Sequence, residues 1–265
     1  MNILEIIAKR TKERIEERKK ALPHEKLVEL ASQMNLGSDY PFEKALQSDD
    51  ISFICEIKKA SPSKGVITDD FRYLEIAKDY EAAGASAISV LTEPYYFMGS
   101  NRHLQEIAQT VKLPLLRKDF TVDSYMIHEA KTLGACAILL ICAIMHQETL
   151  EEYIGIAHSI GLSCLVEAHD ENEVKLALAA GARIIGVNNR NLKTFDIDTS
   201  NSVRLRKLLP PGIIFVSESG VKTAEDIDVY RKNNIDAVLI GETLMRAQNK
   251  KDKLDELRKP VIINN

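Results

Sequence analysis

Several apolar segments of this chain end in carboxylate, ammonium or amide side chains. Such groups can hold, donate and accept protons, and an ammonium placed beside carboxylates can serve as a general acid next to a general base. The candidates are Glu56 and Lys58 in CEIKK, Lys118 in LRKD, Glu167 in LVEAH, Asn188 in GVNN, and Glu218 in VSESG. If these segments are parallel strands, their polar ends collect at one end of one sheet. The pattern therefore predicts acid–base chemistry at that end.

The order of residues within the segments favours a shared site. Side chains alternate between the two faces of a strand, so Glu56 and Lys58 share a face with Ile54, while Phe53 and Cys55 share the apolar face. Burying a charged pair is costly unless its members satisfy each other or a ligand. A single Lys or Glu at a strand end is usually a solvated loop residue. A full set at equivalent positions indicates an active site.

The segments between the apolar runs explain how the set would be positioned. Their hydrophobic period changes from two to about 3.6 residues, as in YLEIAKDYEAAGA and SYMIHEAKTLGA, which predicts a helix after each strand. Gly84, Gly134 and Gly181 should end helices in the left-handed conformation, and Asn233-Asn234 takes that place before the last run. The repeating unit is therefore a strand followed by a helix.

The repeat predicts an α/β fold, a closed (β/α)8 TIM barrel with an N-terminal helical extension. Its strands should start near Phe53, Ala87, Pro114, Ala137, Ser163, Ile184, Ile213 and Ala237. The length of 265 residues suits one such barrel, which typically has roughly 250. We expect one domain over residues 1–265, with residues 1–50 as the extension packed on the barrel. An open doubly wound sheet is the alternative.

The extension carries its own apolar residues. Leu4, Ile7 and Ile15 recur at helical spacing, while Leu27, Leu30 and Tyr40-Pro41-Phe42 need a surface to bury against. We expect the extension to pack over an end of the barrel. If that end is the catalytic one, the extension could help to exclude water.

Composition argues against several classes of protein. A net charge of −4 and a pI near 5.9 disfavour nucleic-acid binding, and the charged segment AKRTKERIEERKK is better explained as a solvated helix face. No run approaches the roughly 18 apolar residues of a membrane span, so we expect no membrane association and a cytoplasmic location. The cysteines show neither CxxC pairing nor metal spacing, which predicts buried free thiols and no metal.

Two further segments suggest a phosphorylated small-molecule substrate. In (β/α)8 barrels, phosphate commonly binds backbone amides after the seventh and eighth strands, where Ser219-Gly220 and Gly241-Glu242 are expected. The carboxylate of Glu242 would repel phosphate, so its backbone amide is the better candidate. The segment Ser61-Pro62-Ser63-Lys64-Gly65 could form a mobile loop over the ligand, or a plain surface loop.

Taken together, the segments CEIKKASPSKG, LTEPYYFMGS, LLRKDF, LVEAHDENE, IGVNNRNLKTFDID, VSESGV and LIGETLMR resemble the indole-3-glycerol-phosphate synthase family of tryptophan biosynthesis. The resemblance runs from about the first helix to the last strand. It implies a carboxy-lyase that closes the pyrrole ring of 1-(2-carboxyphenylamino)-1-deoxyribulose 5-phosphate, with loss of CO2 and water, to give indole-3-glycerol phosphate. It implies no cofactor.

The resemblance also implies roles for individual residues. Lys118 would protonate the carbonyl oxygen during ring closure, Glu167 would remove the late proton, and Lys58 would contact the substrate and assist dehydration. Glu56 and Glu218 would orient the lysines and sugar hydroxyls, and Asn188 would hydrogen-bond a hydroxyl. Arg190 could pair with the anthranilate carboxylate. Phe120 and the segment Tyr95-Tyr96-Phe97 could pack on the aryl ring.

Other readings stay open at this point. Phosphoribosylanthranilate isomerase and the tryptophan synthase alpha chain would share the phosphate loops, but neither explains two inward lysines and the extra N-terminal segment. A noncatalytic phosphate-binding barrel or a pathway scaffold would not need Lys118 or Glu167, yet both are present. The oligomeric state is left open, with a monomer as the working expectation.

Overall fold

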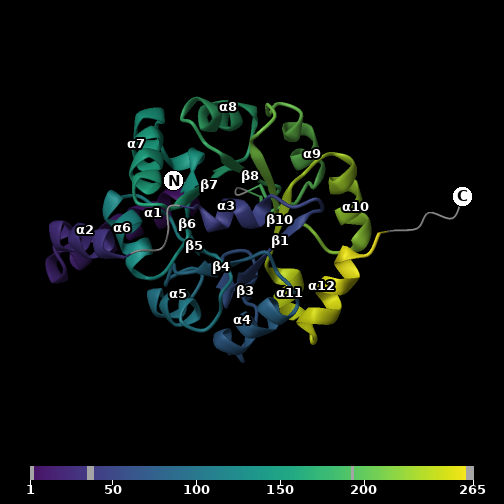
Figure 1. Cartoon of the computed structure of the whole chain (residues 1–265), viewed down its shortest axis with the longest axis horizontal. Helices are drawn as coiled ribbons and strands as arrows, with labels where there is room; N and C mark the ends of the chain where they lie inside the picture. Colours follow the sequence, from purple (N-terminus) through teal and green to yellow (C-terminus); the bar gives the residue numbers. More distant parts are fainter. Residues whose placement is uncertain (1–2, 35–38, 192–193, 261–265) are drawn as a thin grey trace, which may run out of the picture.

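The computed structural model describes residues 3–34, 39–191 and 194–260, and within them parallel strands form a closed barrel (Figure 1). The strand order around the barrel is β1-β10-β9-β8-β7-β6-β5-β4. The strands are β1 (Ser52–Ile57), β4 (Ala87–Leu91), β5 (Leu115–Lys118), β6 (Ala137–Ile141), β7 (Ser163–Ala168), β8 (Ile184–Asn188), β9 (Ile214–Glu218) and β10 (Ala237–Ile240). The predicted barrel is confirmed, and its strands start within one residue of the expected positions.

Helices follow the strands and surround the barrel (Figure 1). They are α4 (Tyr73–Ala82), α5 (Asn101–Ala108), α6 (Ser124–Thr132), the short 3-10 helix η1 (Cys142–Ile144), α7 (Gln147–Ser159), α8 (Glu171–Ala179), α9 (Ser200–Arg206), α10 (Ala224–Lys232), α11 (Glu242–Arg246) and α12 (Lys250–Arg258). Polar side chains start several of them, because Ser100, Asp123, Asp170 and Thr223 each accept a backbone N–H of the first turn. The predicted stops at Gly84, Gly134, Gly181 and Asn234 all have positive φ.

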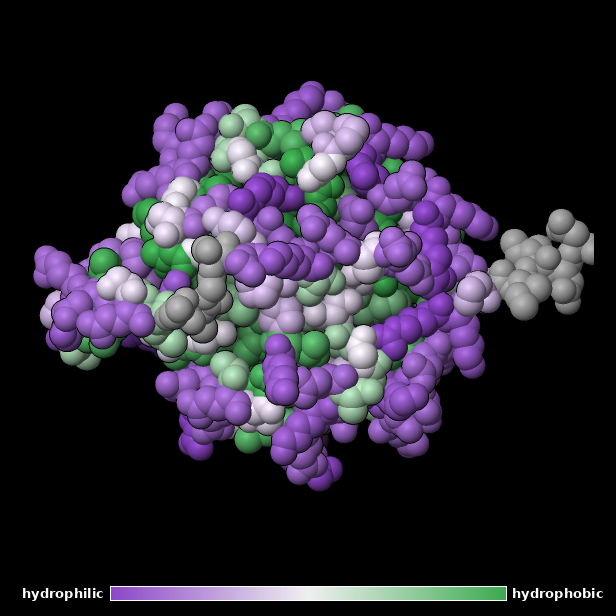
Figure 2. Space-filling view, in the orientation of Figure 1, coloured by the Kyte–Doolittle hydropathy of each residue, from purple (hydrophilic) through white to green (hydrophobic). Residues whose placement is uncertain are grey.

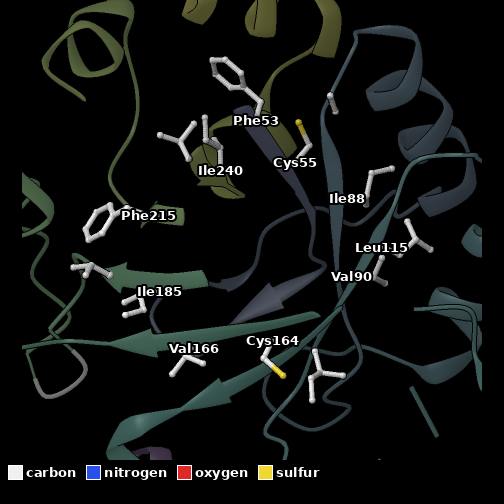
Figure 3. Packing of buried hydrophobic residues seen from close by; sticks show 14 of the residues in the cluster. Phe53, Cys55, Ile88, Val90, Leu115, Cys164, Val166, Ile185, Phe215 and Ile240 are labelled. Carbon is white, nitrogen blue, oxygen red and sulfur yellow. The ribbon is translucent and has the colours of Figure 1, made fainter. Parts of the chain in front are cut away.

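Alternation along the strands separates two apolar cores. One core lies between strands and helices, and Figure 3 shows members such as Phe53, Cys55 and Val166 on the outer face of the barrel wall. The other fills the barrel interior and includes Ile54, Leu116, Leu139, Leu165 and Val216. The inner set shares its strand face with the predicted site residues, as residue parity required.

The N-terminal extension reaches both ends of the barrel. Its helices are α1 (Ile3–Ala21), α2 (His24–Gln33) and α3 (Pro41–Leu46). Leu4 and Ile7 of α1 lie at the carboxyl end of the strands, whereas α3 crosses the opposite end in Figure 1 and buries Phe42 and Leu46 in the inner core. We expected the extension to cover one end of the barrel. It instead places apolar residues of α1 at one end and apolar residues of α3 at the other.

Helix α2 lies outside the barrel wall, beside α6 (Figure 1). Leu27 is buried there against Tyr125 and Met126 of α6. Leu30, however, stays 38% exposed, so the prediction that it needs a burial surface was wrong. The buried residues of α2 are Leu27 and Ala31, four apart, and Leu30 lies beside that line, where its side chain stays open to solvent.

The cysteines are free thiols, as predicted. Cys55, Cys142 and Cys164 are buried, and Cys136 is partly exposed. Burial raises the pKa of the Cys55 and Cys142 thiols to about 12, which keeps them protonated and unreactive.

The outer surface is mostly hydrophilic on the face shown in Figure 2. Among the described residues, none of the helices combines the length and the apolar character needed to cross a bilayer.

Candidate active site

A cavity of about 430 Å³ opens at the carboxyl ends of the barrel strands. This volume lies within the range of about 300–1,000 Å³ that small-molecule sites occupy. The nominated acid–base, amide, arginine and phosphate-loop residues line its wall together with Phe120: Glu56, Lys58, Ser61, Lys118, Phe120, Glu167, Asn188, Arg190, Glu218, Ser219, Gly220, Gly241 and Glu242. The barrel register thus brings the whole set together, while the role of each residue stays a prediction.

Lys118, at the end of β5, lies between two carboxylates, one from β7 and one from β9. Its Nζ donates to Glu167 Oε2 at 3.0 Å and to Glu218 Oε2 at 2.9 Å. All three side chains are nearly closed to solvent, with exposed fractions of 12%, 4% and 2%. An ammonium ion is thus held deep in the cavity by groups that can also take its proton.

Charge and burial act against each other in this cluster. Burial would lower the pKa of Lys118, but Glu218, Glu167 and Glu56 outweigh it and raise that pKa. Burial would raise the pKa of Glu167, yet Lys118 and His169 hold it below its usual value. Burial, together with the neighbouring carboxylates, raises the pKa of Glu218 to about 7. The two glutamates therefore differ, with Glu167 ionised and Glu218 close to half protonated near neutral pH.

The second lysine is paired within its own strand. Lys58 Nζ donates to Glu56 Oε1 at 2.5 Å, and Ser89 of β4 donates to Glu56 Oε2 at 3.4 Å. Gly241, which follows the neighbouring strand β10, leaves room for this pair. A Cβ at Gly241 would lie 2.5 Å from Glu56 Oε1 and 2.9 Å from Lys58 Nζ.

Gly186 of β8 likewise leaves room for the Glu218 side chain. A Cβ there would lie 2.2 Å from Glu218 Oε1, closer than any such contact allows. Glu218 Oε1 is buried without a hydrogen-bond partner among the described residues, so this oxygen is available to a ligand. The glycine in GVNN thus makes space for a carboxylate of the neighbouring strand.

Asn188 and Arg190 form the wall that follows β8. Asn188 Oδ1 accepts the backbone N–H of Arg190 at 3.0 Å, and Arg190 Nη1 donates to the Phe195 carbonyl at 3.2 Å. The guanidinium group of Arg190 keeps further donors for a ligand. Leu192 and Lys193, within the same sequence segment, lie outside the described residues.

The two predicted phosphate loops lie beside one another. Ser219 and Gly220 have φ values of +67° and +103°, and the buried Asn189 side chain donates to the Ser219 carbonyl at 3.0 Å. Glu242 begins α11, and its carboxylate faces Arg246 Nε at 3.1 Å and Lys64 Nζ at 4.0 Å. The charge of Glu242 is therefore compensated locally, which agrees with a backbone role for this position.

Segment 61–65 adopts a defined turn. Ser61 ends the short strand β2 (Ala60–Ser61), which pairs with β3 (Gly65–Val66) in an antiparallel hairpin. Ser61, Pro62, Ser63 and Lys64 all line the cavity. The hairpin therefore contributes one wall of the site.

Aromatic residues divide between the cavity and the surface. Phe120 lines the cavity together with Phe97, with ring centroids 6.5 Å apart. Tyr95 is 57% exposed and lies against Arg10, so its predicted contact with an aryl ring finds no support. Glu93 fixes the turn that carries Phe97 by accepting its backbone N–H at 3.1 Å.

A buried ionic network beside the cavity was not predicted from the sequence. Arg117 and Asp119 flank Lys118, are nearly inaccessible to solvent, and connect with Arg14 of α1 and Glu129 of α6. They lie on the strand face that parity assigns to the helices. Two charged residues on a strand face that is otherwise apolar could have indicated this buried network.

The described residues contain no group of three or more His, Cys, Asp or Glu side chains arranged to hold a metal ion. The chemistry that the observed groups can perform is proton transfer between ammonium and carboxylate groups, together with recognition of anions by Arg190 and the cationic rim at Lys64 and Arg246.

Solved structures with a similar fold include 3-hexulose-6-phosphate synthase from Salmonella typhimurium, with a TM-score of 0.65 and 12% identity over 78% of this chain and 96% of that one. KGPDC from Streptococcus mutans has a TM-score of 0.61 and 10% identity, covering 79% and 96% of the two chains. At these identities the likeness concerns the fold alone.

Sequence comparisons are more specific. The chain is 57% identical to the indole-3-glycerol phosphate synthase of Ruminiclostridium cellulolyticum, covering 97% of this chain and 98% of that protein. The enzyme of the same name from Lachnoclostridium phytofermentans is 46% identical, with the same coverage. The family model "Indole-3-glycerol phosphate synthase" matches residues 4–257. On this evidence, and with the expected residues gathered in one cavity, the chain belongs to the indole-3-glycerol phosphate synthase family.

Proposed function

We propose that this protein is an indole-3-glycerol-phosphate synthase. It closes the pyrrole ring of 1-(2-carboxyphenylamino)-1-deoxyribulose 5-phosphate, with release of CO2 and water. The observation that carries the proposal is the position of Lys118, a buried ammonium ion held between Glu167 and Glu218. The reaction needs an acid and a base within reach of the same substrate carbons, and this cluster supplies both.

The first step joins the aryl carbon that bears the carboxylate to the ribulose carbonyl carbon. As the bond forms, Lys118 Nζ gives its proton to the carbonyl oxygen, which becomes a hydroxyl group. In the free protein, the carboxylates hold that proton tightly, since they raise the pKa of Lys118. A substrate hydroxyl that replaces one carboxylate would release it, because the ammonium ion would lose part of its charge compensation.

Loss of CO2 then returns the bonding electrons to the ring. Lys58 assists departure of the hydroxyl group as water, with Glu56 fixing its ammonium group at 2.5 Å. Glu167 removes the last ring proton, which completes the aromatic indole. Glu218, whose pKa is near 7, hydrogen-bonds a sugar hydroxyl through Oε1 and sets the charge around Lys118.

Binding groups surround this cluster on two sides. Arg190 pairs with the anthranilate carboxylate, and Asn188 hydrogen-bonds a hydroxyl group. Phe120 and Phe97 pack on the aryl ring. The phosphate lies against the backbone amides of Ser219-Gly220 and Gly241-Glu242, near Ser61 of the hairpin, where Lys64 and Arg246 add positive charge.

We also propose that the protein acts in the cytoplasm, as a single-domain monomer. The cavity and all its nominated groups come from one chain, so a partner subunit is not required to complete the site.

The test is to mix purified protein with the carboxyphenylamino-deoxyribulose phosphate and follow indole fluorescence, with and without EDTA. We expect product in both mixtures. Tight substrate binding without product would instead support a noncatalytic phosphate-binding barrel. If neither binding nor product is found, the proposed substrate is wrong.

A further inference from the structure

His169 lies directly behind the proposed base. It follows β7, and its Nε2 is 3.4 Å from Glu167 Oε1. Its side chain is 19% exposed, and it does not belong to the cavity wall that the described residues form. His169 can therefore reach the substrate only through Glu167.

Three contacts with Glu173 and Asn201 hold His169 in this position. Glu173 Oε2 of α8 accepts the backbone N–H of His169 at 2.8 Å and lies 2.9 Å from its Nδ1. Asn201 of α9 donates to the His169 carbonyl at 3.1 Å. Because Glu173 is the acceptor at Nδ1, that nitrogen carries a proton and Nε2 faces Glu167.

The charges around the ring favour an imidazolium ion. Burial would lower the pKa of His169, but the carboxylates of Glu173, Glu167 and Glu218 raise it. Lys118 is the neighbouring cation, and it lies on the far side of Glu167. The distance of 3.4 Å is long for a strong hydrogen bond, and Nε2 has no hydrogen-bond partner among the described residues, so its interaction with Glu167 is mainly electrostatic.

The two oxygens of Glu167 thus face two different cations. Oε2 accepts from Lys118 Nζ at 3.0 Å, and Oε1 faces His169. A carboxylate buried as deeply as Glu167 would take up a proton without such partners. In the proposed reaction Lys118 turns to the substrate carbonyl, whereas His169 stays in place.

We propose that His169 is a positioning residue that keeps Glu167 ionised and oriented while Lys118 engages the substrate, and that Glu173 holds His169 in its charged form. The inference rests on the proposed function. Glu173 of α8 would thus hold His169, and His169 would in turn hold Glu167 at the end of β7.

The kinetic test is the pH profile of kcat for His169→Asn. Removing a positive charge raises the pKa of Glu167, so the acidic limb of the profile should move up by about one pH unit. On the lower part of that limb, below the pKa of Glu167 in either protein, we expect kcat to fall about tenfold, whereas at about pH 8.5 it should stay within about threefold of wild type, with KM nearly unchanged. His146→Asn, at an exposed position before α7, is the matched control and should leave the profile unchanged.

A purely structural role for His169 would lower kcat by the same factor at every pH. That result, or an unmoved acidic limb, would overturn the proposal. The kinetic arm requires product formation by the wild-type protein, so its complete absence would count against the proposed function instead.

A second measurement does not depend on turnover. In an NMR titration of the histidine rings, the resonances of His169 are those lost in His169→Asn. We expect its pKa above the ordinary value of about 6.5, and a decrease of about one unit in both Glu173→Gln and Glu167→Gln, because charge coupling between two sites is reciprocal. A wild-type value at or below about 6, or no response to Glu167→Gln, would show that the two side chains are not coupled.

Discussion

Arg14 Nη2 donates to both carboxylate oxygens of Asp119, at 3.0 and 2.9 Å, and so joins helix α1 to the residue between Lys118 and Phe120. The two side chains are only 8% and 1% exposed. Asp119 also accepts from Thr92 Oγ1 at 2.8 Å. The extension is therefore attached at the strand end that carries the proposed acid.

Arg14→Met should both destabilise the fold and weaken substrate binding. Asp119 would lose its main cation while remaining buried, which we expect to cost about 2 kcal/mol in free energy of unfolding. Ile3, Leu4 and Ile7 of α1 line the cavity, so KM should rise about tenfold. Urea denaturation and steady-state kinetics measure both effects. Lys20→Met, which breaks an exposed pair with Glu17, should change stability by less than about 0.5 kcal/mol. Equal effects of the two substitutions would refute the attachment.

Lys118→Ala should remove turnover while the fold persists. We expect kcat to fall by at least about 10³-fold, because the proposed acid is lost. Glu167 and Glu218 would then lose the ammonium ion between them, and one of them should bind a proton. The melting temperature of the variant, relative to wild type, should therefore decrease as pH rises. A parallel loss of activity and melting temperature at every pH would instead identify Lys118 as a structural residue.

Glu167→Gln should lower kcat by about 10² to 10³-fold with little change in KM, because an amide cannot remove the ring proton. Glu171→Gln is a suitable control, since Glu171 lies nearby on α8 but pairs with Lys175 at the surface. Its kcat should equal that of wild type. Steady-state kinetics with saturating substrate would check this, and an unchanged rate for Glu167→Gln would exclude it as the base.

Glu218→Gln should change the dependence of stability on pH. The pKa of Glu218 is raised to about 7 in the folded protein, so its contribution to stability is fully present below the unfolded pKa and is lost as pH rises through about 7. The neutral amide removes this loss. Relative to wild type, the variant should therefore gain about 1 to 3 kcal/mol between about pH 5 and pH 8 in urea denaturation. A constant difference across this range would show that Glu218 titrates normally.

Gly186→Ala should displace Glu218 without disrupting the barrel. The new methyl group would meet Glu218 Oε1, the end of a side chain that can move, so we expect about 1 kcal/mol of destabilisation and a loss of kcat of at least about tenfold. Gly155→Ala provides the control, because nothing lies within 4 Å of its Cβ position in α7. That substitution should stabilise the helix by about 0.5 to 1 kcal/mol and leave kcat unchanged.

The barrel and the membership of the site were predictable from local patterns. Strand starts follow from the change of hydrophobic period, and parity alone placed Lys118, Glu167 and Glu218 on the inner face. Parallel strands bring their carboxyl ends together, so residues that are recognised one strand at a time in the sequence lie in one site in the folded protein.

The pairing within the site was not predictable in the same way. Lys58 pairs within its own strand, whereas Lys118 pairs across the barrel, and this choice depends on side-chain conformations and on space left by Gly186 and Gly241. Arg117 and Asp119 were missed because their partners come from other elements. His169 was missed although Glu167 and Glu173 are only two and four residues away, because the direction of its side chain is set only in the folded protein. The course of the extension also depends on surfaces that exist only in the folded barrel, which is why Leu30 was misjudged.

The extension that reaches both ends of the barrel also constrains when the chain can fold. Residues 3–46 leave the ribosome before the barrel strands, yet α1 contacts η1, α2 packs on α6, and β1 must wait for β10 before its second edge is paired. The nascent chain therefore carries undocked amphipathic helices and an open strand edge for most of its synthesis. Because α1, which lines the cavity, is made before the barrel that it covers, the nascent chain needs protection from aggregation during translation.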